Sequence, residues 1–268
     1  MKSGSFILLT GLATFIIGFL PGNGISEELV IVGTGAGMTV LEAVGKTFTE
    51  KNPEISIVVP KSIGSGGGIK AVGTDAYIIG RVARDISERE KRYGLIQHPL
   101  AKLPIVFYIN ESVSIENLTF EQACSIYSGE SRKWEDIGGG QGPIRVIRRE
   151  DGDSSLQVFF NTLPGFKAII QTRISKVTYT DQETIKNCVH QENSIAYGTL
   201  SNVKNISGIR ILSLGNRSPF KNGYPHVGPI DLVYKKKNYS GSLKKFIEFI
   251  PSDAATKAII KAGALPAK

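Results

Sequence analysis

Three loops rich in Gly, Ser and Thr constrain the fold of this chain more than any other feature. Each follows a predicted strand and opens a predicted helix: residues 33–39 (GTGAGMT), 64–68 (GSGGG) and 152–155 (GDSS). Such loops are typical of α/β folds with parallel strands, where they meet at the carboxyl ends of the strands. Helix N-termini offer unpaired N–H groups and partial positive charge, and glycine lets a ligand approach the backbone. The loops therefore predict an oxyanion site, although each alone could be a tight turn.

Strand and helix patterns alternate along the chain. Predicted strands at 29–32, 55–59 and 76–80 enclose predicted helices at 39–51 and 69–72. This order predicts a mainly parallel sheet flanked by helices. Further strands are predicted at 104–110, 144–147, 195–197 and 229–234. Further helices are predicted at 120–127, 156–161 and 184–190, with a final helix pair at 243–262.

The N-terminus has the pattern of a secretory signal peptide. Lys2 precedes an apolar run at 6–20, and a turn-forming segment with Pro21 follows. Residues 1–24 are therefore predicted to be a signal peptide, with cleavage between Gly22 and Ser26 and a periplasmic mature protein. A retained membrane anchor is the alternative, although the apolar run is shorter than an ordinary span. The segment after the apolar run contains no cysteine, which argues against a lipid anchor.

The charge balance favours an anionic partner. The chain carries 32 Lys and Arg against 24 Asp and Glu, a net charge of +8. Apart from the run at 235–237, interpreted as a solvated turn, the basic residues are scattered, which argues against a nucleic-acid surface. The two cysteines, Cys124 and Cys188, lack metal or redox spacing. They are either a disulfide or two buried thiols.

Enzymatic functions find little support in the motifs. The first loop resembles a dinucleotide fingerprint, but the next strand ends in Pro60 and Lys61 where an acidic residue is required. No P-loop Gly-Lys-Ser or Gly-Lys-Thr is present. A hydrolase would draw its nucleophile and its base from Ser65, Ser154, Ser155, His98, His190 and His226. These residues match neither a nucleophile elbow nor a zinc motif, so we expect no catalytic residue, metal or cofactor.

Several segments together resemble the substrate-binding proteins of phosphate ABC importers. They are residues 63–70 (IGSGGGIK), 118–129 with Trp134, 149–155, 195–198 and the closing helix to Gly263, and the resemblance covers 28–266. It implies two α/β lobes joined by two crossing strands, with the anion between them. Lobe one is then 28–104 plus 225–268, and lobe two is 105–224. It also implies a monomer that binds inorganic phosphate or a similar oxyanion and delivers it to an inner-membrane permease.

The resemblance also implies the ligand-binding residues. They are Ala36, Gly37, Met38, Thr39, Ser65, Gly66, Gly67, Ala83, Arg84, Arg149, Asp153, Ser154 and Ser155. Ser65 matches the family's serine, and Arg149 matches the arginine that pairs with the anion. Three positions depart from the family: Gly37 and Met38 stand where it has a Thr hydroxyl, which Thr39 could replace, and Ala83 stands where it has a proton-accepting Asp.

The third loop has Asp153 where the family has Ser. Asp153 either replaces the missing carboxylate as acceptor of a phosphate proton or caps the following helix. Arg81 and Arg84 are also unusual, and we expect one in the cleft and the other in solvent. They leave a phosphonate, an organic phosphate or sulfate open as the ligand. A secreted hydrolase or sensor domain acting on phosphate-bearing molecules is the alternative from another functional class.

Overall fold

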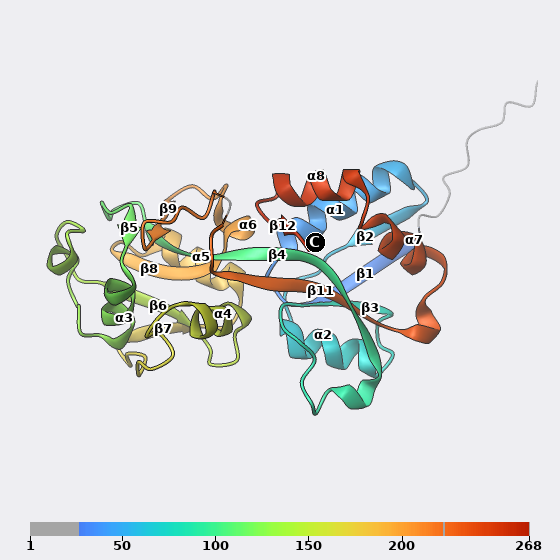
Figure 1. Ribbon diagram of the computed structural model, residues 1–268, viewed down its shortest axis with the longest axis horizontal. Coiled ribbons are helices and arrows are strands. Elements are labelled where there is room, and N and C mark those ends of the chain that lie inside the picture. The colour runs from blue at the N-terminus through green and yellow to red at the C-terminus, as the bar shows by residue number, and fades with distance from the viewer. Residues whose placement is uncertain (1–26, 222, 268) are drawn as a thin grey trace, which may run out of the picture.

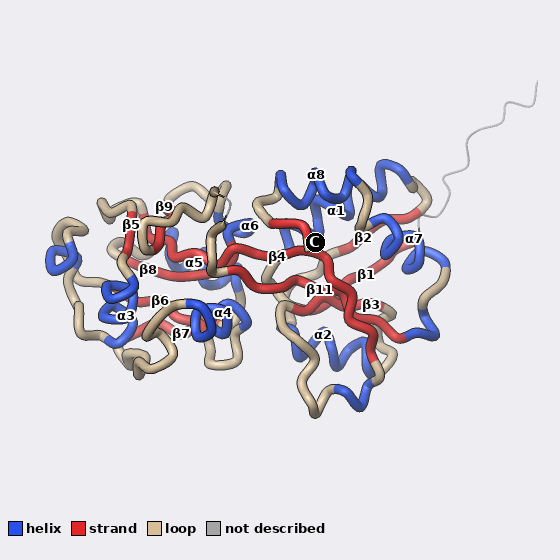
Figure 2. Tube along the Cα trace, in the orientation of Figure 1, coloured by secondary structure: helices blue, strands red, loops and turns tan. Residues whose placement is uncertain are grey.

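The computed structural model describes residues 27–221 and 223–267, which form two lobes side by side (Figure 1). Two strands, β4 (Leu95–Asn110) and β11 (Val227–Lys235), run between the lobes (Figure 2). The predicted two-lobed α/β fold is therefore confirmed. The predicted signal peptide and its cleavage region lie outside the described residues. Within the described ranges, no helix is long and apolar enough to cross a membrane.

The first lobe is built on a sheet with strand order β2-β1-β3-β11-β4. Its other strands are β1 (Glu27–Gly33), β2 (Ile55–Val58) and β3 (Ile79–Val82), and β12 (Leu265–Pro266) pairs with β4. β1 is parallel to β2 and β3, as predicted, whereas β11 is antiparallel to β3 and β4. The prediction placed β3 too early, because Tyr77 and Ile78 are apolar but exposed.

Four helices cover this sheet: α1 (Met38–Lys51), α2 (Gly64–Gly73), α7 (Gly241–Phe249) and α8 (Asp253–Lys261). The prediction of a loop at 64–68 is wrong, because these residues form the first turns of α2. The tight packing of this helix requires glycine: a Cβ on Gly68 would lie 2.8 Å from Cα of Gly33 at the end of β1. The second loop thus presents a helix N-terminus directly.

The second lobe continues the sheet from β4 in the order β4-β8-β6-β7. Its strands are β5 (Asn117–Leu118), β6 (Arg145–Arg149), β7 (Ser175–Thr178), β8 (Ser194–Thr199), β9 (Ile209–Ile211) and β10 (Ser213–Leu214). Its helices are α3 (Phe120–Ser128), α4 (Ser154–Thr162), α5 (Asp181–His190) and α6 (Leu200–Val203). β6 is parallel to both β7 and β8. The carboxyl ends of β6, β7 and β8 therefore lie at the same edge of the sheet.

An aromatic cluster fixes the centre of the second lobe. Phe107 of β4 and Phe159 of α4 stack with ring centroids 4.5 Å apart, and Tyr127, Phe166 and Tyr197 surround them edge-on or tilted. These rings are fully buried. Because such pairs stabilise beyond the area they bury, the cluster holds β4, α4 and β8 in one rigid unit.

Both cysteines are free thiols in this structure. Cys188 is buried in α5, and Cys124 is half-buried in α3. The sequence left open a disulfide or two thiols, and the structure has two thiols and no disulfide between Cys124 and Cys188.

His226, next to β11, gives the first testable prediction. Its side chain is 1% exposed, Nδ1 lies 2.9 Å from the Thr162 hydroxyl, and Nε2 has no hydrogen-bond partner among the described residues. Burial, and then the Arg217 charge, lower the pKa of His226 to about 4. The unfolded chain therefore binds a proton that the folded chain does not, and this costs stability as pH falls through the window between about 6.5 and 4.

We expect the titration of His226 to lower the free energy of unfolding by about 3 kcal/mol as the pH falls from 7 to 4. The measurement is urea unfolding of the wild type and of His226→Phe across this range, because the difference between the two cancels other titrating groups. A wild-type curve that tracks the variant at every pH would contradict the prediction.

Candidate functional site

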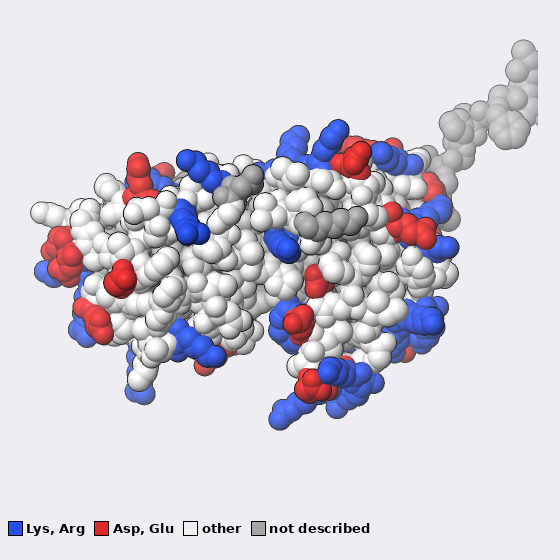
Figure 3. All heavy atoms as spheres, viewed as in Figure 1, with Lys and Arg blue, Asp and Glu red and all other residues white. Residues whose placement is uncertain are grey.

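A cavity of ≈ 300 Å³ lies between the two lobes. Its lining comes from the ends of β1, β3 and β6 and from the first turns of α2 and α4: Thr34, Gly35, Ser62, Gly64, Ser65, Gly66, Arg84, Arg149, Glu150, Gly152, Asp153, Ser154 and Tyr179. Figure 3 shows a notch between the lobes along the lower edge of the molecule, and in Figure 1 α2 and α4 lie on its two sides. The tertiary structure thus brings all three glycine-rich loops to one site.

Two helix N-termini supply N–H groups to this cavity. α2 begins at Gly64 and α4 begins at Ser154, and both residues line the cavity. The first N–H groups of a helix have no acceptor within it, and the helix dipole adds partial positive charge there. Gly64 has φ +73°, a conformation that favours glycine and lets the backbone turn sharply at the mouth of the site. A Cβ at this position would meet no atom within 4 Å. This arrangement suits an oxyanion.

Three hydroxyl groups at the site keep a proton available to donate. The Ser65 hydroxyl accepts the Ala83 N–H at 3.1 Å, and the Thr34 hydroxyl accepts the Ala36 N–H at 3.2 Å. Ser155 is buried, and its Oγ has no hydrogen-bond partner among the described residues. A buried polar atom without a partner is costly, so an acceptor beside it would be favoured.

Arg149, at the end of β6, is held in place by backbone and side-chain contacts. Its N–H donates to the Tyr197 hydroxyl at 3.1 Å, and Nη2 donates to the Tyr179 carbonyl at 3.3 Å. Tyr197 belongs to the aromatic cluster, which therefore fixes the backbone of Arg149. The side chain is only 5% exposed. Nη1 has no hydrogen-bond partner within the part of the chain that the structure describes.

Three carboxylates surround the Arg149 guanidinium. Asp153 Oδ2 lies 3.1 Å from Nη2, Glu150 Oε2 lies 3.3 Å from Nε, and Asp181 Oδ2 lies 3.4 Å from Nη1. Burial disfavours the charge of Arg149, but these carboxylates outweigh it and raise the pKa of Arg149 further. The arginine is therefore a permanent cation, and the three carboxylates around it already offset its positive charge. Sequence reasoning did not anticipate Asp181.

Asp153 both caps α4 and pairs with Arg149. Its Oδ1 accepts the Leu156 N–H at 2.9 Å, which is an ordinary N-cap. The capping role, one of the two left open by the sequence, is therefore present. Burial raises the pKa of Asp153, Arg149 opposes this rise, and Asp181 adds to it. Asp153 also lines the cavity, so its role as a proton acceptor stays a prediction.

Arg81 and Arg84 have different places, and neither is a freely solvated side chain. Arg81 is fully buried and donates to the carbonyls of Thr34, Pro60 and Ile31, so it fixes the ends of β1 and β2 behind the first two loops. Burial lowers the pKa of Arg81 to about 10. Arg84 lines the cavity and pairs with Glu90 at 2.8 Å. The prediction of one arginine in solvent is thus wrong for Arg81.

Several predicted ligand-binding residues do not line the cavity. In the first loop, Thr34 and Gly35 line it, whereas Ala36, Gly37, Met38 and Thr39 do not. The Thr39 hydroxyl donates to Asn202 Oδ1 of the second lobe at 2.8 Å. Gly67, Ala83 and Ser155 also fall outside the lining, although Ser155 carries the unpartnered hydroxyl.

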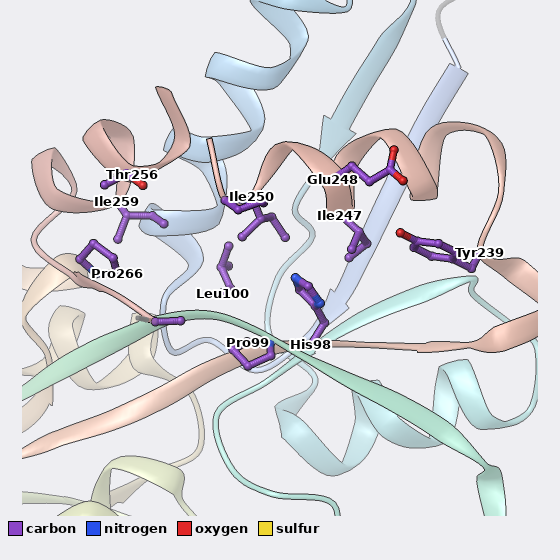
Figure 4. Close-up of a pocket in the computed structure, with 12 residues that line it drawn as sticks. His98, Pro99, Leu100, Tyr239, Ile247, Glu248, Ile250, Thr256, Ile259 and Pro266 are labelled. Atoms are coloured by element: carbon purple, nitrogen blue, oxygen red, sulfur yellow. The ribbon is translucent and has the colours of Figure 1, made fainter. Parts of the chain in front are cut away.

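A second cavity, of ≈ 480 Å³, lies within the first lobe between β4, α7 and α8. Figure 4 shows His98 and Leu100 of β4 pointing toward Ile247 and Ile250. Its walls are mostly apolar, and none of the described arginines lines it. It is therefore unsuited to an oxyanion, and the interlobe cavity is the candidate site.

Comparisons with known proteins show the family of this chain. A model of the PBP superfamily domain matches residues 21–254. The chain belongs to the PBP superfamily. Two curated proteins similar to this PBP superfamily chain are both called phosphate-binding protein PstS. The Borreliella burgdorferi protein is 24% identical over 259 residues, covering 92% of each chain. The Bacillus subtilis protein is 23% identical over 244 residues, covering 88% of this chain and 79% of its own.

Solved structures of phosphate transport proteins share the two-lobed fold. One, assigned as a phosphate ABC transporter substrate-binding protein of Clostridium perfringens, contains bound phosphate. It superposes with a TM-score of 0.80 and is 29% identical, covering 90% of this chain and 100% of its own. An ABC-type phosphate transport receptor of Vibrio cholerae is 21% identical with a TM-score of 0.63, covering 88% and 99%, and it shows the fold alone.

Proposed function

We propose that this chain is an extracytoplasmic solute-binding protein that captures phosphate between its lobes and delivers it to an ABC importer, without catalysis. The observation that carries this proposal is the convergence of Arg149, two helix N-termini and the hydroxyls of Thr34 and Ser65 on one small cavity. The similar Clostridium perfringens protein contains bound phosphate, which supports the same ligand here.

The proposed ligand contacts use groups from both lobes. Arg149 Nη1 and the Ser155 hydroxyl are buried donors without a partner among the described residues, and Ser65 presents a hydroxyl from the other lobe. A tetrahedral oxyanion accepts several hydrogen bonds at once, so it would satisfy these donors together. Closure of the lobes by a hinge motion of β4 and β11 would bury it.

The proposed arrangement outside the site follows the family. We propose lobe boundaries at 104/105 and 224/225, close to where β4 and β11 pass between the lobes. We also propose a monomer that is exported with its signal peptide removed and docks on an inner-membrane permease.

Isothermal titration tests the ligand directly. The protein from residue 27 onward is titrated with phosphate, sulfate and methylphosphonate. We expect saturable heat with phosphate at one site per chain and weaker or no heat with sulfate, because carboxylates around Arg149 repel an anion that carries no proton. Absence of heat with all three anions would reject the small-oxyanion function. Heat with methylphosphonate alone would show that the ligand is a phosphonate and not phosphate.

A further inference from the structure

Asp181 is a buried carboxylate at the boundary between the lobes. It is the first residue of α5 in the second lobe, and its side chain is 6% exposed. Its Oδ2 lies 3.4 Å from Arg149 Nη1, the end of the guanidinium that has no hydrogen-bond partner among the described residues. Asp181 thus takes the part of Arg149 that is otherwise available to a ligand.

The same oxygen of Asp181 is pressed against the first lobe. A Cβ built on Gly35 would lie only 2.5 Å from Asp181 Oδ2, and Gly35 lines the cavity. Only a glycine at this position leaves room for the carboxylate. A negative oxygen therefore already lies between the first glycine-rich loop and the arginine, the two groups from opposite lobes that the proposed phosphate site uses.

Neighbouring contacts reinforce this junction. Gln182 Nε2 donates to Met38 Sδ at 3.0 Å, and Asn202 Nδ2 donates to the Gly35 carbonyl at 3.0 Å. The Thr39 hydroxyl donates to Asn202 Oδ1. Gln182 of α5 and Asn202 of α6 thus bind the first loop of lobe one directly.

We propose that Asp181 is an affinity-determining residue whose carboxylate competes with the bound oxyanion for Arg149 and the first loop, and that it holds the lobes together in the empty protein. This inference rests on the proposed phosphate site. The anion must displace this carboxylate or bind against its charge, so affinity is lower than the donors alone would give. In return, the empty cleft keeps its arginine paired, which avoids an isolated buried charge.

The charged side chains around Asp181 show why this carboxylate, and not a neighbouring one, would compete with the anion. Arg149 is the only cation within salt-bridge distance of it among the described residues, and Asp153 and Glu150 contact the same guanidinium. Asp153 is engaged by the Leu156 N–H, and Glu150 is 34% exposed. Asp181 is the carboxylate that also contacts the opposite lobe, so its removal affects both affinity and lobe closure.

The test compares Asp181→Asn with the wild type by phosphate titration and by small-angle X-ray scattering without ligand. We expect phosphate binding at least about tenfold tighter, because the substitution removes a like charge that repels the anion at a partly buried site. We also expect a larger radius of gyration in the empty state. Glu183→Gln is the matched control: it removes the same charge from the same turn of α5, where Glu183 accepts the Tyr179 N–H, and should change neither quantity.

A second variant keeps the charge of Asp181 and disturbs its contact with the first lobe. Gly35→Ala pushes Asp181 Oδ2 off the first lobe, and the φ of Gly35 is not positive, so alanine fits the backbone. We expect it to open the empty protein as Asp181→Asn does. Unchanged or weaker phosphate binding by Asp181→Asn would overturn the competition. An unchanged radius of gyration in both variants would overturn the proposal that Asp181 holds the lobes together, whether or not the wild type binds phosphate. Absence of wild-type binding would instead reject the phosphate function.

Discussion

Arg149→Lys is expected to weaken phosphate binding by about 100-fold. Lysine keeps the charge but loses the planar fork, and charge-assisted hydrogen bonds contribute about 1.5–3 kcal/mol each. The loss includes Nη1, the buried donor without a hydrogen-bond partner among the described residues. Isothermal titration with phosphate measures the change, and circular dichroism checks that the variant is folded.

Arg148 provides the matched control for Arg149. It is the preceding residue of β6, carries the same charge, and contacts Ser175 and Asp151 outside the cavity lining. Arg148→Lys should leave phosphate affinity within about twofold, as expected for a partly exposed ion pair. Equal losses in the two variants would show that Arg149 acts through general charge and not through direct contact.

Gly33→Ala is expected to lower the free energy of unfolding by about 4 kcal/mol or more. Gly33 ends β1 with φ +139°, a conformation that strongly favours glycine, and a Cβ there would lie 2.0 Å from the Arg81 carbonyl oxygen. The clash is with the backbone of β3, so a rotamer change cannot relieve it. Chemical unfolding measures the loss.

Gly64→Ala separates backbone strain from the steric clash. Gly64 also has positive φ, at +73°, but a Cβ there meets nothing within 4 Å. We therefore expect a loss of only about 1–2 kcal/mol, the cost of a left-handed conformation alone. If Gly33→Ala cost no more than Gly64→Ala, the close approach of β1 to β3 would not be the reason for glycine at 33.

Much of the fold follows from local patterns. The amphipathic spacing of Val40, Leu41, Val44 and Phe48 predicts α1, and all four are buried in it. Boundaries were less predictable where packing overrides the local signal. α2 begins within a glycine run because its N-terminus packs against β1, and β3 begins later than its apolar residues indicate.

The site was predictable in its parts but not in its electrostatics. The glycine-rich loops indicated an oxyanion site, and the resemblance added Ser65 and Arg149. Thr34 was within the first loop and could have been chosen for its hydroxyl. Asp181 had a weaker signal: Thr180 and Glu183 mark the start of a helix, but nothing local indicates that this helix starts beside Arg149.

The sequence by itself determined that three segments rich in Gly, Ser and Thr lie at the starts of helices, because chain conformation in each segment depends on neighbouring residues. Only the tertiary structure decided how the charges of those loops combine. Arg149 and Asp181 are 32 positions apart along the chain, and their contact requires that β6 ends and α5 begins at the same edge. Such a contact is set by the packing of whole elements, so the carboxylates around the arginine became visible only in the folded protein.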